Sequence, residues 1–318
     1  MTPMTNILVT GAGGPAGVSV VRALVGSGEL VVAVDADPLA AGLGLAHHHA
    51  VVCAATERDR FVTELAQVAR EHSVDMIIST VSEEMLVLAG REHELDVPVW
   101  LPKRRAVAAC VDKWRFWKIA EHANIPAAAS ALGNGCGEEI AANLPGPWIV
   151  KPRFDGGARN AYAVDDPAEL AWACSRVIDP IVQTRQSGRE FTVDLLTDHA
   201  GCLAGAVPRW RLETRAGIST KGRTFCDARV TGIAARCAAV YSLTGAANLQ
   251  GFVTDDDAVV VTQVNPRFSG GLSLSLAAGA DLVGEFVRGT LGMSLRPDRL
   301  QFRPDVTMVR NDTELFAA

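Results

Sequence analysis

Short apolar runs alternate with amphipathic segments over the first hundred residues. Asn6–Thr10 and Leu30–Val34 are typical of buried strands, and Val18–Val25 is predicted to form a helix between them. A helical repeat over Phe61–Arg70 and another buried strand over Asp75–Ser79 continue the pattern. Strands that alternate with helices form parallel sheets, so this part of the chain is predicted to be a doubly wound α/β domain.

The pattern is less regular in the rest of the chain. Helices are predicted over Asp112–Ala123 and Asp166–Val177. Strands are predicted over Trp148–Lys151 and Ile181–Gln183, and Glu190–Leu196 alternates polar and apolar residues. This mixture indicates an α+β region, and 318 residues suit two or three lobes.

The segment 247–265 is predicted to be a β-hairpin, because the acidic run Asp255-Asp256-Asp257 separates an apolar-rich stretch from a β-branched one. A two-residue turn at the last two of these acids sets Gln250 opposite Gln263, and a period of two puts Gln263 and Asn265 on one face. Three amide oxygens and Arg267 then converge, which suits a metal-bound polyphosphate. A surface hairpin with polar side chains is the alternative.

Composition limits the classes of partner. The chain is 48% apolar with a net charge of −6, so neither nucleic acid nor an anionic membrane is expected as a general partner. Seven scattered cysteines, never spaced as Cys-x-x-Cys, are typical of buried thiols in a reducing compartment. No signal peptide and no apolar run of transmembrane length are evident, so we expect a cytoplasmic protein.

A glycine loop, Gly11–Gly17, lies between the first strand and the first helix, and Asp35 ends the next strand. This context suits a nicotinamide dinucleotide and suggests a short-chain type of dehydrogenase. Such enzymes need a tyrosine with a lysine four residues later, and neither Tyr162 nor Tyr241 has one. The interpretation we favour is that these glycines permit a tight turn and close helix–strand packing.

A second nucleotide site is indicated by two lysines. Lys113 opens a helix, and Lys151 ends a strand just before a turn that contains Gly156 and Gly157. A lysine beside a glycine turn can bind phosphates through its charge and through backbone N–H groups. For either lysine alone, a solvent-exposed cation is the commoner case. Glu190, farther along the chain, could accept hydrogen bonds from a ribose.

In their order along the chain these pieces resemble the ATP-grasp superfamily, in particular carbamoyl-phosphate synthetase large subunits and pyrrolysine-type amino-acid ligases. The resemblance covers residues 6–295 and rests on the glycine loop, Asp112-Lys113, Lys151-Pro152, Gln183 through Glu190, Asn248-Leu249-Gln250, and Asn265-Pro266-Arg267-Phe268-Ser269-Gly270-Gly271. It implies ATP and Mg²⁺ as ligands. The implied contacts are phosphates at Lys113 and Lys151, an adenine hinge that includes Gln183, Thr184 and Gln186, ribose at Glu190, and one or two Mg²⁺ at Gln250, Gln263 and Asn265.

Two positions depart from the family pattern. Gln263 stands where the family usually has Glu, so this ligand offers an oxygen without a charge. A second Mg²⁺ is therefore expected to bind less tightly, because each lost anion weakens a close-range Coulomb attraction. Thr184 stands at a hinge position that is often acidic, so adenine recognition should depend more on backbone groups.

The segment Pro208–Arg223 is rich in basic residues for an acidic protein. It is either a solvated loop or an electropositive cover over transferred phosphate. We predict Arg209, Arg211 and Arg267 as the catalytic stabilisers of phosphate charge. The residues predicted to contact the substrates are Ser82, Glu83, Lys221, Ser269 and Gly270.

The predicted fold class is α/β, with an N-terminal doubly wound parallel-sheet domain followed by a two-lobed α+β ATP-grasp region. The expected domains are residues 1–105, a small lobe at 106–182 and a large lobe at 183–318. The predicted function is ATP-dependent ligation of a carboxylate to an amine through an acyl phosphate, with small, amino-acid-like substrates. A homodimer is compatible with this prediction. The alternatives are a NAD(P)-dependent reductase or epimerase and a nucleotide-binding protein without catalysis.

Overall fold

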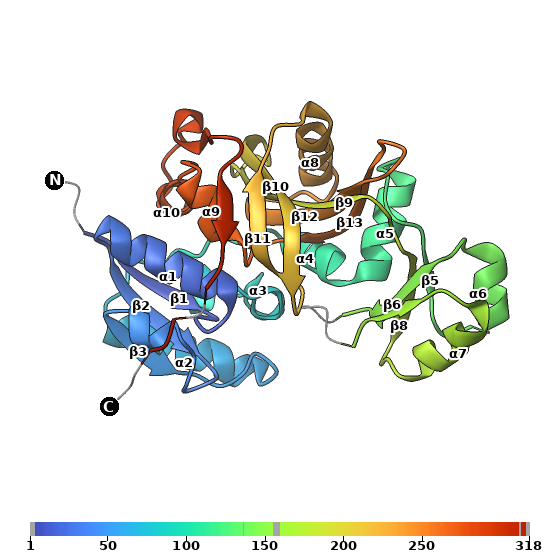
Figure 1. Cartoon of the computed structure of the whole chain (residues 1–318). Helices are drawn as coiled ribbons and strands as arrows, with labels where there is room; N and C mark the ends of the chain where they lie inside the picture. The colour runs from blue at the N-terminus through green and yellow to red at the C-terminus, as the bar shows by residue number, and fades with distance from the viewer. Residues whose placement is uncertain (1–3, 136, 155–159, 312, 316–318) are drawn as a thin grey trace.

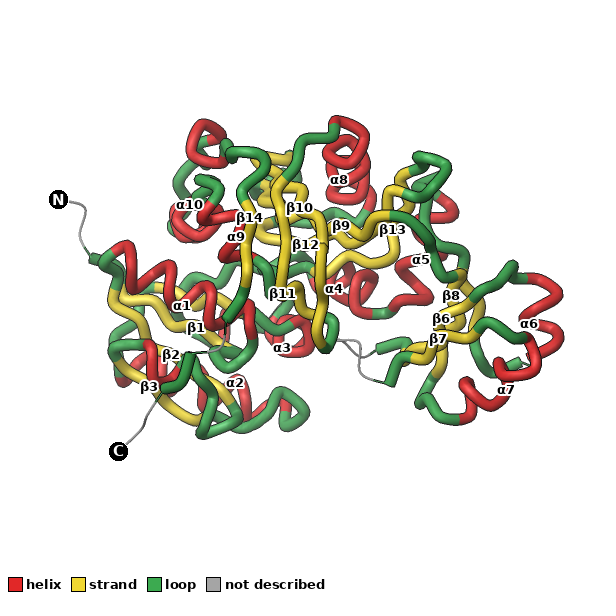
Figure 2. The backbone as a smooth tube through the Cα atoms, in the orientation of Figure 1, coloured by secondary structure: helices red, strands yellow, loops and turns green. Residues whose placement is uncertain are grey.

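The computed structural model describes residues 4–135, 137–154, 160–311 and 313–315. These residues form three sheets that follow one another across the molecule, with the largest sheet in the middle (Figures 1 and 2). The N-terminal sheet lies on one side of it, and a small sheet with two helices lies on the other. The predicted combination of a parallel N-terminal sheet with an α+β remainder is confirmed.

The N-terminal sheet has four parallel strands in the order β3-β2-β1-β4. Its elements are β1 (Asn6–Thr10), α1 (Pro15–Ser27), β2 (Leu30–Asp35), β3 (His48–Val51), α2 (Arg58–Glu71), β4 (Met76–Ser79) and α3 (Ser82–Leu88). Helix α1 begins earlier than predicted, at Pro15, because the fixed φ of proline suits the first helical position. The strand order reverses between β1 and β4, and the carboxyl ends of those strands border the kind of switch point where ligands bind in open α/β sheets.

The small sheet has the strand order β5-β8-β6-β7 and is antiparallel. Its elements are β5 (Ser130–Leu132), α6 (Gly137–Asn143), β6 (Trp148–Pro152), β7 (Tyr162–Val164), α7 (Pro167–Ser175) and β8 (Pro180–Thr184). Trp148, Val150 and Val182 pack against the two helices in a hydrophobic cluster built only from this part of the chain.

The large sheet has six antiparallel strands in the order β13-β12-β9-β10-β11-β14. Its strands are β9 (Arg189–Thr197), β10 (Leu203–Arg215), β11 (Ile218–Thr224), β12 (Gly245–Val253), β13 (Val259–Asn265) and β14 (Thr307–Val309). The helices around it are α4 (Arg104–Val111), α5 (Lys113–His122), α8 (Ala228–Val240), α9 (Leu272–Ala277) and α10 (Leu282–Thr290). One face of the sheet is apolar and packs against α5 and α8.

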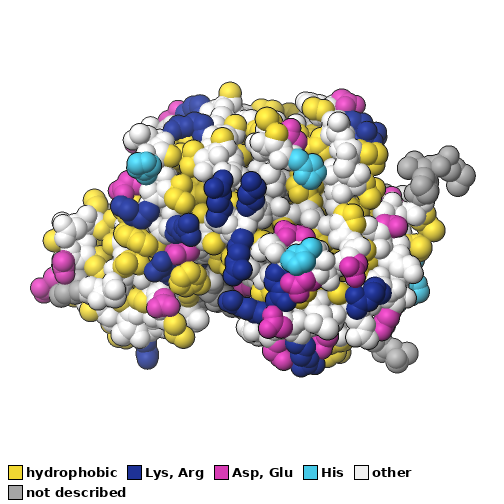
Figure 3. All heavy atoms as spheres, turned by 180° about the vertical axis from the view of Figure 1, so that it is seen from behind, with side chains coloured by type: hydrophobic (Ala, Val, Ile, Leu, Met, Phe, Trp, Pro, Cys, Tyr) yellow, Lys and Arg dark blue, Asp and Glu magenta, His cyan; other side chains and the backbone are white. Residues whose placement is uncertain are grey.

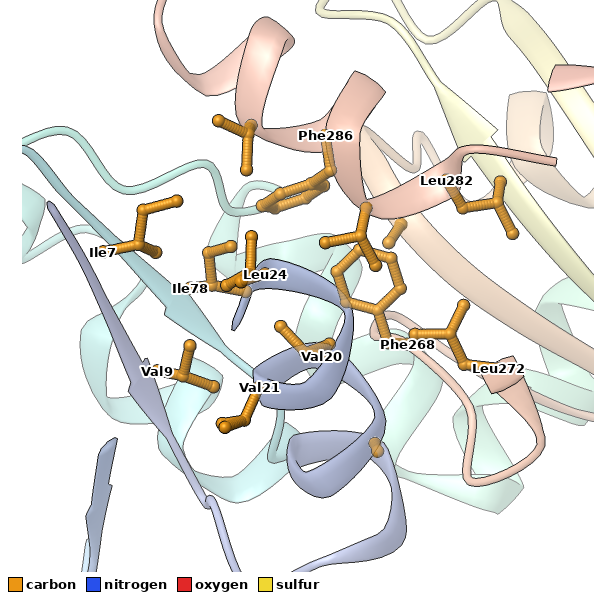
Figure 4. Packing of buried hydrophobic residues seen from close by; sticks show 14 of the residues in the cluster. Ile7, Val9, Val20, Val21, Leu24, Ile78, Phe268, Leu272, Leu282 and Phe286 are labelled. Atoms are coloured by element: carbon orange, nitrogen blue, oxygen red, sulfur yellow. The ribbon is translucent and has the colours of Figure 1, made fainter. Parts of the chain in front are cut away.

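A shared hydrophobic core joins the N-terminal sheet to the large sheet. Val20 and Leu24 of α1 lie in one cluster with Phe268, Leu282 and Phe286 (Figure 4). Burial of large apolar side chains stabilises such a contact by about 1.5–3 kcal/mol each. The N-terminal sheet and the large sheet are thus built on a common core, whereas the small sheet has a core of its own.

Among the residues that the structure describes, no helix combines the length and the apolar character needed to cross a membrane.

Candidate active site

Polar side chains gather on one face of the large sheet. On β9, Val193 and Leu195 point into the hydrophobic core, so the intervening Thr192 and Asp194 point to the opposite face. The register sets Gln250 of β12 beside Thr192 and thereby continues this face onto the next strand. A polar surface on a central sheet is unusual, because such strands are ordinarily covered by apolar contacts, and it marks this face as the candidate site.

The β12–β13 hairpin has the predicted pairing but not the predicted turn. Gln250 does lie opposite Gln263. The strands are joined by a loop in which Thr254 N donates to Ala258 O at 2.9 Å, so the prediction of a two-residue turn was wrong. A register shift next to Gly251 absorbs the difference and restores the pairing. A Cβ at Gly251 would lie 2.4 Å from a backbone oxygen of β13, so this irregularity requires glycine.

The candidate Mg²⁺ ligands are three half-buried amide side chains, Gln250, Gln263 and Asn265. Gln263 Nε2 donates to Asn265 Oδ1 at 3.1 Å, so the last two lie side by side as predicted. Amide oxygens are hard, neutral ligands that fit Mg²⁺. Within the described ranges, no group of three His, Cys, Asp or Glu side chains could hold a metal ion. The set therefore fits a Mg²⁺ whose remaining oxygens and negative charge come from bound phosphates.

Asp194 is the centre of a buried polar cluster that the sequence prediction missed. Arg209 donates to it from Nε and Nη2, both at 3.0 Å, and Ser275 Oγ donates at 2.6 Å. Asn248 Nδ2 donates to Asp194 Oδ1 at 3.1 Å. The available signal was the alternation of β9, which places an acid on the same face as the predicted ligands.

Arg209, one of the three predicted catalytic arginines, is buried. Its side chain is 1% exposed, and Nη2 also donates to Ser269 Oγ at 2.9 Å. Nε and Nη2 are thus bonded to Asp194 and Ser269 beneath the loop that follows β13, whereas Nη1 is buried with no hydrogen-bond partner among the described residues. The paired guanidinium thus shapes the site from below, and stabilisation of phosphate charge by Arg209 stays a prediction.

Arg211 and Glu190 form an ion pair at the open end of the polar face. Arg211 Nη1 lies 2.8 Å from Glu190 Oε1, and Nη2 donates to Gly217 O at 2.6 Å in the tip of the β10–β11 hairpin. Burial raises the pKa of Glu190 and lowers that of Arg211, and the attraction between the two opposes both shifts. Glu190, predicted to bind ribose, therefore already has a cationic partner.

Arg267 lies between the large sheet and the N-terminal domain. Its Nη1 donates to Phe268 O at 2.7 Å. Burial lowers the pKa of Arg267, and the charges of Glu83 and Asp194 oppose this shift. Glu83 is exposed at the start of α3, whereas the neighbouring Ser82 is buried. Of the three predicted catalytic arginines, Arg267 is half-buried and has no hydrogen-bonded carboxylate among the described residues.

The two predicted phosphate-binding lysines lie near the junction of α5 with the small sheet. Lys113 Nζ donates to Pro152 O at 2.8 Å, and Lys151 Nζ donates to Gln183 Oε1 at 2.8 Å. Burial, reinforced by the charge of Lys113, lowers the pKa of Lys151 to about 7. The predicted contacts at Gly156 and Gly157 lie outside the described residues.

Gln183 is not placed to recognise adenine with its side chain. It is 5% exposed, accepts from Lys151, and donates from Nε2 to Ser130 Oγ at 3.2 Å. The period of two along β8 places Gln183 on the face of the small sheet opposite the apolar cluster that contains Val182, and Lys151 lies on this same face. Its amide orients Lys151 instead.

The hinge between the sheets is held by hydrogen bonds that end on backbone carbonyl groups. Thr184 N donates to Ala129 O at 2.9 Å, and Thr184 Oγ1 donates to Pro145 O at 3.0 Å. Gln186 Nε2 donates to Thr184 O at 3.1 Å. Gly188 has a φ of 105°, which only glycine adopts without strain, and it allows the chain to turn into β9.

The carboxyl edge of the N-terminal sheet holds a glutamate that was not among the predicted site residues. Glu84 accepts hydrogen bonds from Thr10 Oγ1 and, at 3.3 Å, from Ser79 Oγ. Burial raises the pKa of Glu84 to about 7. The predicted substrate residues Ser82 and Glu83 precede it in the first turn of α3, Ser82 buried and Glu83 exposed.

The glycine loop is closely packed. A Cβ at Gly17 would lie 2.2 Å from Gly11 O, and Gly13 N donates to Asp35 Oδ2 at 2.7 Å. Asp35 thus accepts from the loop itself. These contacts support the packing interpretation of the loop over a dinucleotide site.

The remaining predicted substrate residues lie in two different places. Lys221 pairs with Glu213 at 2.7 Å on the exposed part of the β10–β11 hairpin. Ser269 is buried, and Gly270 lies next to it, close to Pro15 of the N-terminal domain. Ser269 and Gly270 therefore lie in the loop that contains Arg267. Lys221 lies on the hairpin instead and is paired with Glu213.

Two family models match the chain. Residues 177–314 match the family described as ATP-grasp in the biosynthetic pathway with Ter operon, and residues 7–99 match the PylC-like N-terminal domain. Residues 177–314 thus belong to an ATP-grasp family. Its similarity to PylC-like proteins in the N-terminal domain agrees with the resemblance read from the sequence.

Known ATP-grasp proteins resemble this one in sequence and in fold. A D-alanine–D-alanine ligase of Cereibacter sphaeroides is 30% identical over 144 residues, which are 42% of this chain and 46% of that protein, and one of Halorhodospira halophila is 32% identical over 108 residues, 33% of this chain and 34% of that protein. The chain thus covers less than half the length of these relatives.

Solved structures match over almost the whole chain. Carboxyaminoimidazole ribonucleotide synthase from Aspergillus clavatus, complexed with ATP, has a TM-score of 0.76 at 16% identity and covers 95% of this chain and 81% of its own. L-amino acid ligase from Bacillus licheniformis has a TM-score of 0.72 at 14% identity and covers 96% and 78%. At such identities the likeness establishes the fold alone.

Proposed function

We propose that this ATP-grasp protein is an ADP-forming ligase that joins a carboxylate to an amine. The observation that carries this proposal is the polar face of the large sheet. There the amide oxygens of Gln250, Gln263 and Asn265 lie on the same face as the Asp194–Arg209 pair, and Arg267 follows β13 directly. Two lysines at the junction with the small sheet complete a set of groups suited to a nucleoside triphosphate. Similarity to D-alanine–D-alanine ligases supports the same reaction class.

The chemistry needs no covalent bond to the protein. A carboxylate oxygen of the substrate attacks the γ-phosphorus of ATP, and the bond from that phosphorus to the ADP oxygen breaks. The amine nitrogen then attacks the carbonyl carbon of the acyl phosphate, phosphate leaves, and the nitrogen loses a proton. Positioning and stabilisation of phosphate charge dominate such reactions. We propose that Arg267 and Lys151 supply that stabilisation.

Mg²⁺ would be held by the oxygens of Gln250, Gln263 and Asn265 and would neutralise phosphate charge. Because these ligands are neutral, we propose that one Mg²⁺ binds mainly through the nucleotide and that a second binds more weakly. The chain's own residues orient the phosphates: Lys151, aligned by Gln183, supplies positive charge at one end, and Arg267 supplies it at the other.

The substrates are proposed to be small and amino-acid-like. Basic side chains gather along the middle of the rear face with acidic ones next to them, which does not resemble a uniform nucleic-acid surface (Figure 3). The cysteines that the structure describes are free thiols, which suits a reducing compartment such as the cytoplasm. We also propose that the protein forms a homodimer.

A paired screen of amino acids tests the reaction. ATP, Mg²⁺ and two amino acids are supplied together, ADP release is measured, and the product mass is determined. We expect ADP release that requires both amino acids, with a product lighter by one water than their sum. ADP release that never depends on a second substrate, or release of AMP, would contradict the proposed reaction.

A nucleotide-binding protein without catalysis is the second candidate, and the neutral metal ligands favour it. If Gln263 has abolished catalysis, ATP with Mg²⁺ binds but no amino-acid pair yields ADP. The substitution Gln263→Glu adds one negative charge beside Asn265 and should strengthen Mg²⁺ binding. Appearance of ligase activity only in that variant would establish the second candidate.

A NAD(P)-dependent enzyme that uses the glycine loop is less well supported. The close packing at Gly17 and the hydrogen bond from Gly13 to Asp35 use the features that a dinucleotide would need. Binding of NAD(P) in the absence of ATP binding would favour this alternative.

A further inference from the structure

The peptide that joins Gly270 to Gly271 is held at both ends. Arg310 Nη2 donates to Gly270 O at 2.6 Å, and Gly271 N donates to Ser269 Oγ at 3.1 Å. In a planar trans peptide the C=O and N–H groups point in opposite directions. A rotation of this peptide would therefore break both hydrogen bonds at once.

The two ends are anchored in different parts of the fold. On the N–H side, Ser269 Oγ also accepts from Arg209, which is fixed by Asp194 in the buried cluster of the large sheet. A Cβ at Gly271 would lie 2.2 Å from Arg209 Nη1, so no side chain fits between them. The buried cluster thus supports the peptide from below.

On the C=O side, Arg310 is placed by the last strand of the large sheet. β14 pairs with β11, and Arg310 N extends that pairing by donating to Thr220 O at 2.8 Å. Farther along, Leu315 lies 4.0 Å from the position of a Cβ at Gly44 in the N-terminal domain. Figure 1 shows this segment passing from the large sheet to the N-terminal sheet.

Gly270 lies where three parts of the protein meet. A Cβ at this residue would be 3.3 Å from Pro15 Cβ, at the start of α1, and 3.8 Å from Ile218 Cγ2, at the start of β11. The loop that contains Gly270 follows Arg267 within three residues. Its conformation therefore affects how a substrate can approach Arg267 from the side of the N-terminal domain.

We propose that Arg310 is a positioning residue, which fixes the Gly270–Gly271 peptide and thereby shapes the part of the site that receives the substrates other than ATP. This inference rests on the proposed ligase function. Loss of the hydrogen bond frees the Gly270 carbonyl and allows the Ser269–Gly271 loop to sample other orientations. The proposed nucleotide end, at Lys113 and Lys151, lies at the junction with the small sheet and has contacts that do not involve Arg310.

The first test needs no substrate. Hydrogen exchange of the Gly271 amide is compared in the full-length protein and in the variants Arg310→Ala, Arg310→Lys and Arg303→Ala. Arg303 is the matched control: it is exposed, and its Nη2 donates at 3.0 Å to Ala277 O, the carbonyl that ends α9. We expect Arg310→Ala to speed exchange by about tenfold or more, Arg310→Lys to restore part of the protection, and Arg303→Ala to leave it unchanged.

The second test uses a substrate pair found by the screen. We expect Arg310→Ala to lower kcat/KM for the non-nucleotide substrates by about 10- to 100-fold while KM for ATP stays unchanged. An equal rise in KM for ATP, or wild-type exchange and kinetics in Arg310→Ala, would overturn the positioning role. If the wild-type protein forms no product with any pair, the ligase proposal fails, and the exchange result still decides whether Arg310 holds the loop.

Discussion

The cationic groups at the two ends of the site are held in different ways. In the large sheet, Arg209 is paired with Asp194 and Arg211 with Glu190, so each positive charge is balanced before any ligand binds. At the junction with the small sheet, Lys151 donates to the neutral amide of Gln183, and burial lowers its pKa. The arginines of the large sheet are therefore paired with carboxylates before any ligand binds, whereas Lys151 is held by a neutral group, and we propose that bound phosphates balance its charge.

The hydrophobic cores of the two regions also differ. The large sheet shares a core with the N-terminal domain, and the small sheet packs only on its own helices. Asp112 provides a polar link, because it caps α5 and accepts from Arg153 Nε at 2.7 Å and Nη2 at 2.6 Å. A small lobe with its own core and a backbone hinge can move as a unit, as lids do in many enzymes.

The largest expected effect is on the large sheet. Asp194→Ala leaves the buried guanidinium of Arg209 without its partner and should lower the free energy of unfolding by about 3–5 kcal/mol. Chemical denaturation measures the change. The double variant Asp194→Leu with Arg209→Met removes both charges and should recover much of the loss. If Asp194→Ala unfolds at the wild-type denaturant concentration, the large sheet does not depend on this pair.

Arg267→Ala tests the chemistry beside that pair. The substitution should lower kcat by about 10²–10³-fold, as does the loss of one pre-organised charge stabiliser in other enzymes. Arg303→Ala is the surface control for loss of a cation. Steady-state ADP release measures both variants, and an unchanged rate in Arg267→Ala would remove Arg267 from the catalytic groups.

The strand pairing and the helix starts described above could largely be predicted from the sequence. The opposition of Gln250 and Gln263 follows from strand periodicity and hairpin pairing, although the structure reaches it by a longer loop and a register shift at Gly251. Local patterns also predicted a helix that begins at Asp112, and in the structure Asp112 caps α5 by accepting from Trp114 N and Arg115 N.

The roles of buried polar residues could not be predicted in the same way. Whether Arg209 faces a phosphate or an acid depends on Asp194, which is 15 residues away in sequence and on the neighbouring strand. Gln183 turns toward Lys151 for a similar reason, 32 residues away. Sequence patterns give the face of a strand, but cross-strand partners decide what a side chain on that face does.

The nucleotide end should show a pH dependence that the large sheet lacks. Bound phosphates favour charged Lys151 and raise its pKa above the value of about 7 in the free protein. Nucleotide binding then takes up a proton above that pH, and affinity should fall by up to about tenfold per pH unit as the pH rises further. Titration calorimetry in buffers of different ionisation enthalpy measures the uptake.

Lys151→Arg is the control for that experiment, because arginine stays charged throughout this range. The difference between the two proteins also removes the titration of ATP itself. An affinity for nucleotide that has the same pH dependence in both proteins would contradict a titrating Lys151.

The smallest expected effect concerns the N-terminal edge of the site. Burial raises the pKa of Glu84 from an ordinary 4.5 to about 7, so its contribution to stability is present at acidic pH and is lost as pH rises through 7. Glu84→Gln keeps an oxygen for Thr10 and Ser79 and removes the charge. It should raise the free energy of unfolding by about 1–3 kcal/mol near pH 8 and change it little near pH 4.

Glu83→Gln, at the exposed neighbouring position, serves as the control for Glu84→Gln. Denaturant unfolding at the two pH values measures both variants. Equal stability of Glu84→Gln and wild type at the higher pH would show that the Glu84 carboxylate is not penalised by burial.

The central claim is transfer of a phosphoryl group from ATP to a carboxylate. It is tested most directly with a carboxylate substrate, taken from the amino-acid screen, whose oxygens are ¹⁸O. Mass analysis of the inorganic phosphate follows one turnover. Formation of an acyl phosphate predicts that each phosphate released carries one ¹⁸O atom from the substrate and that ADP is the nucleotide product. Unlabelled phosphate, or AMP with pyrophosphate, would contradict the account.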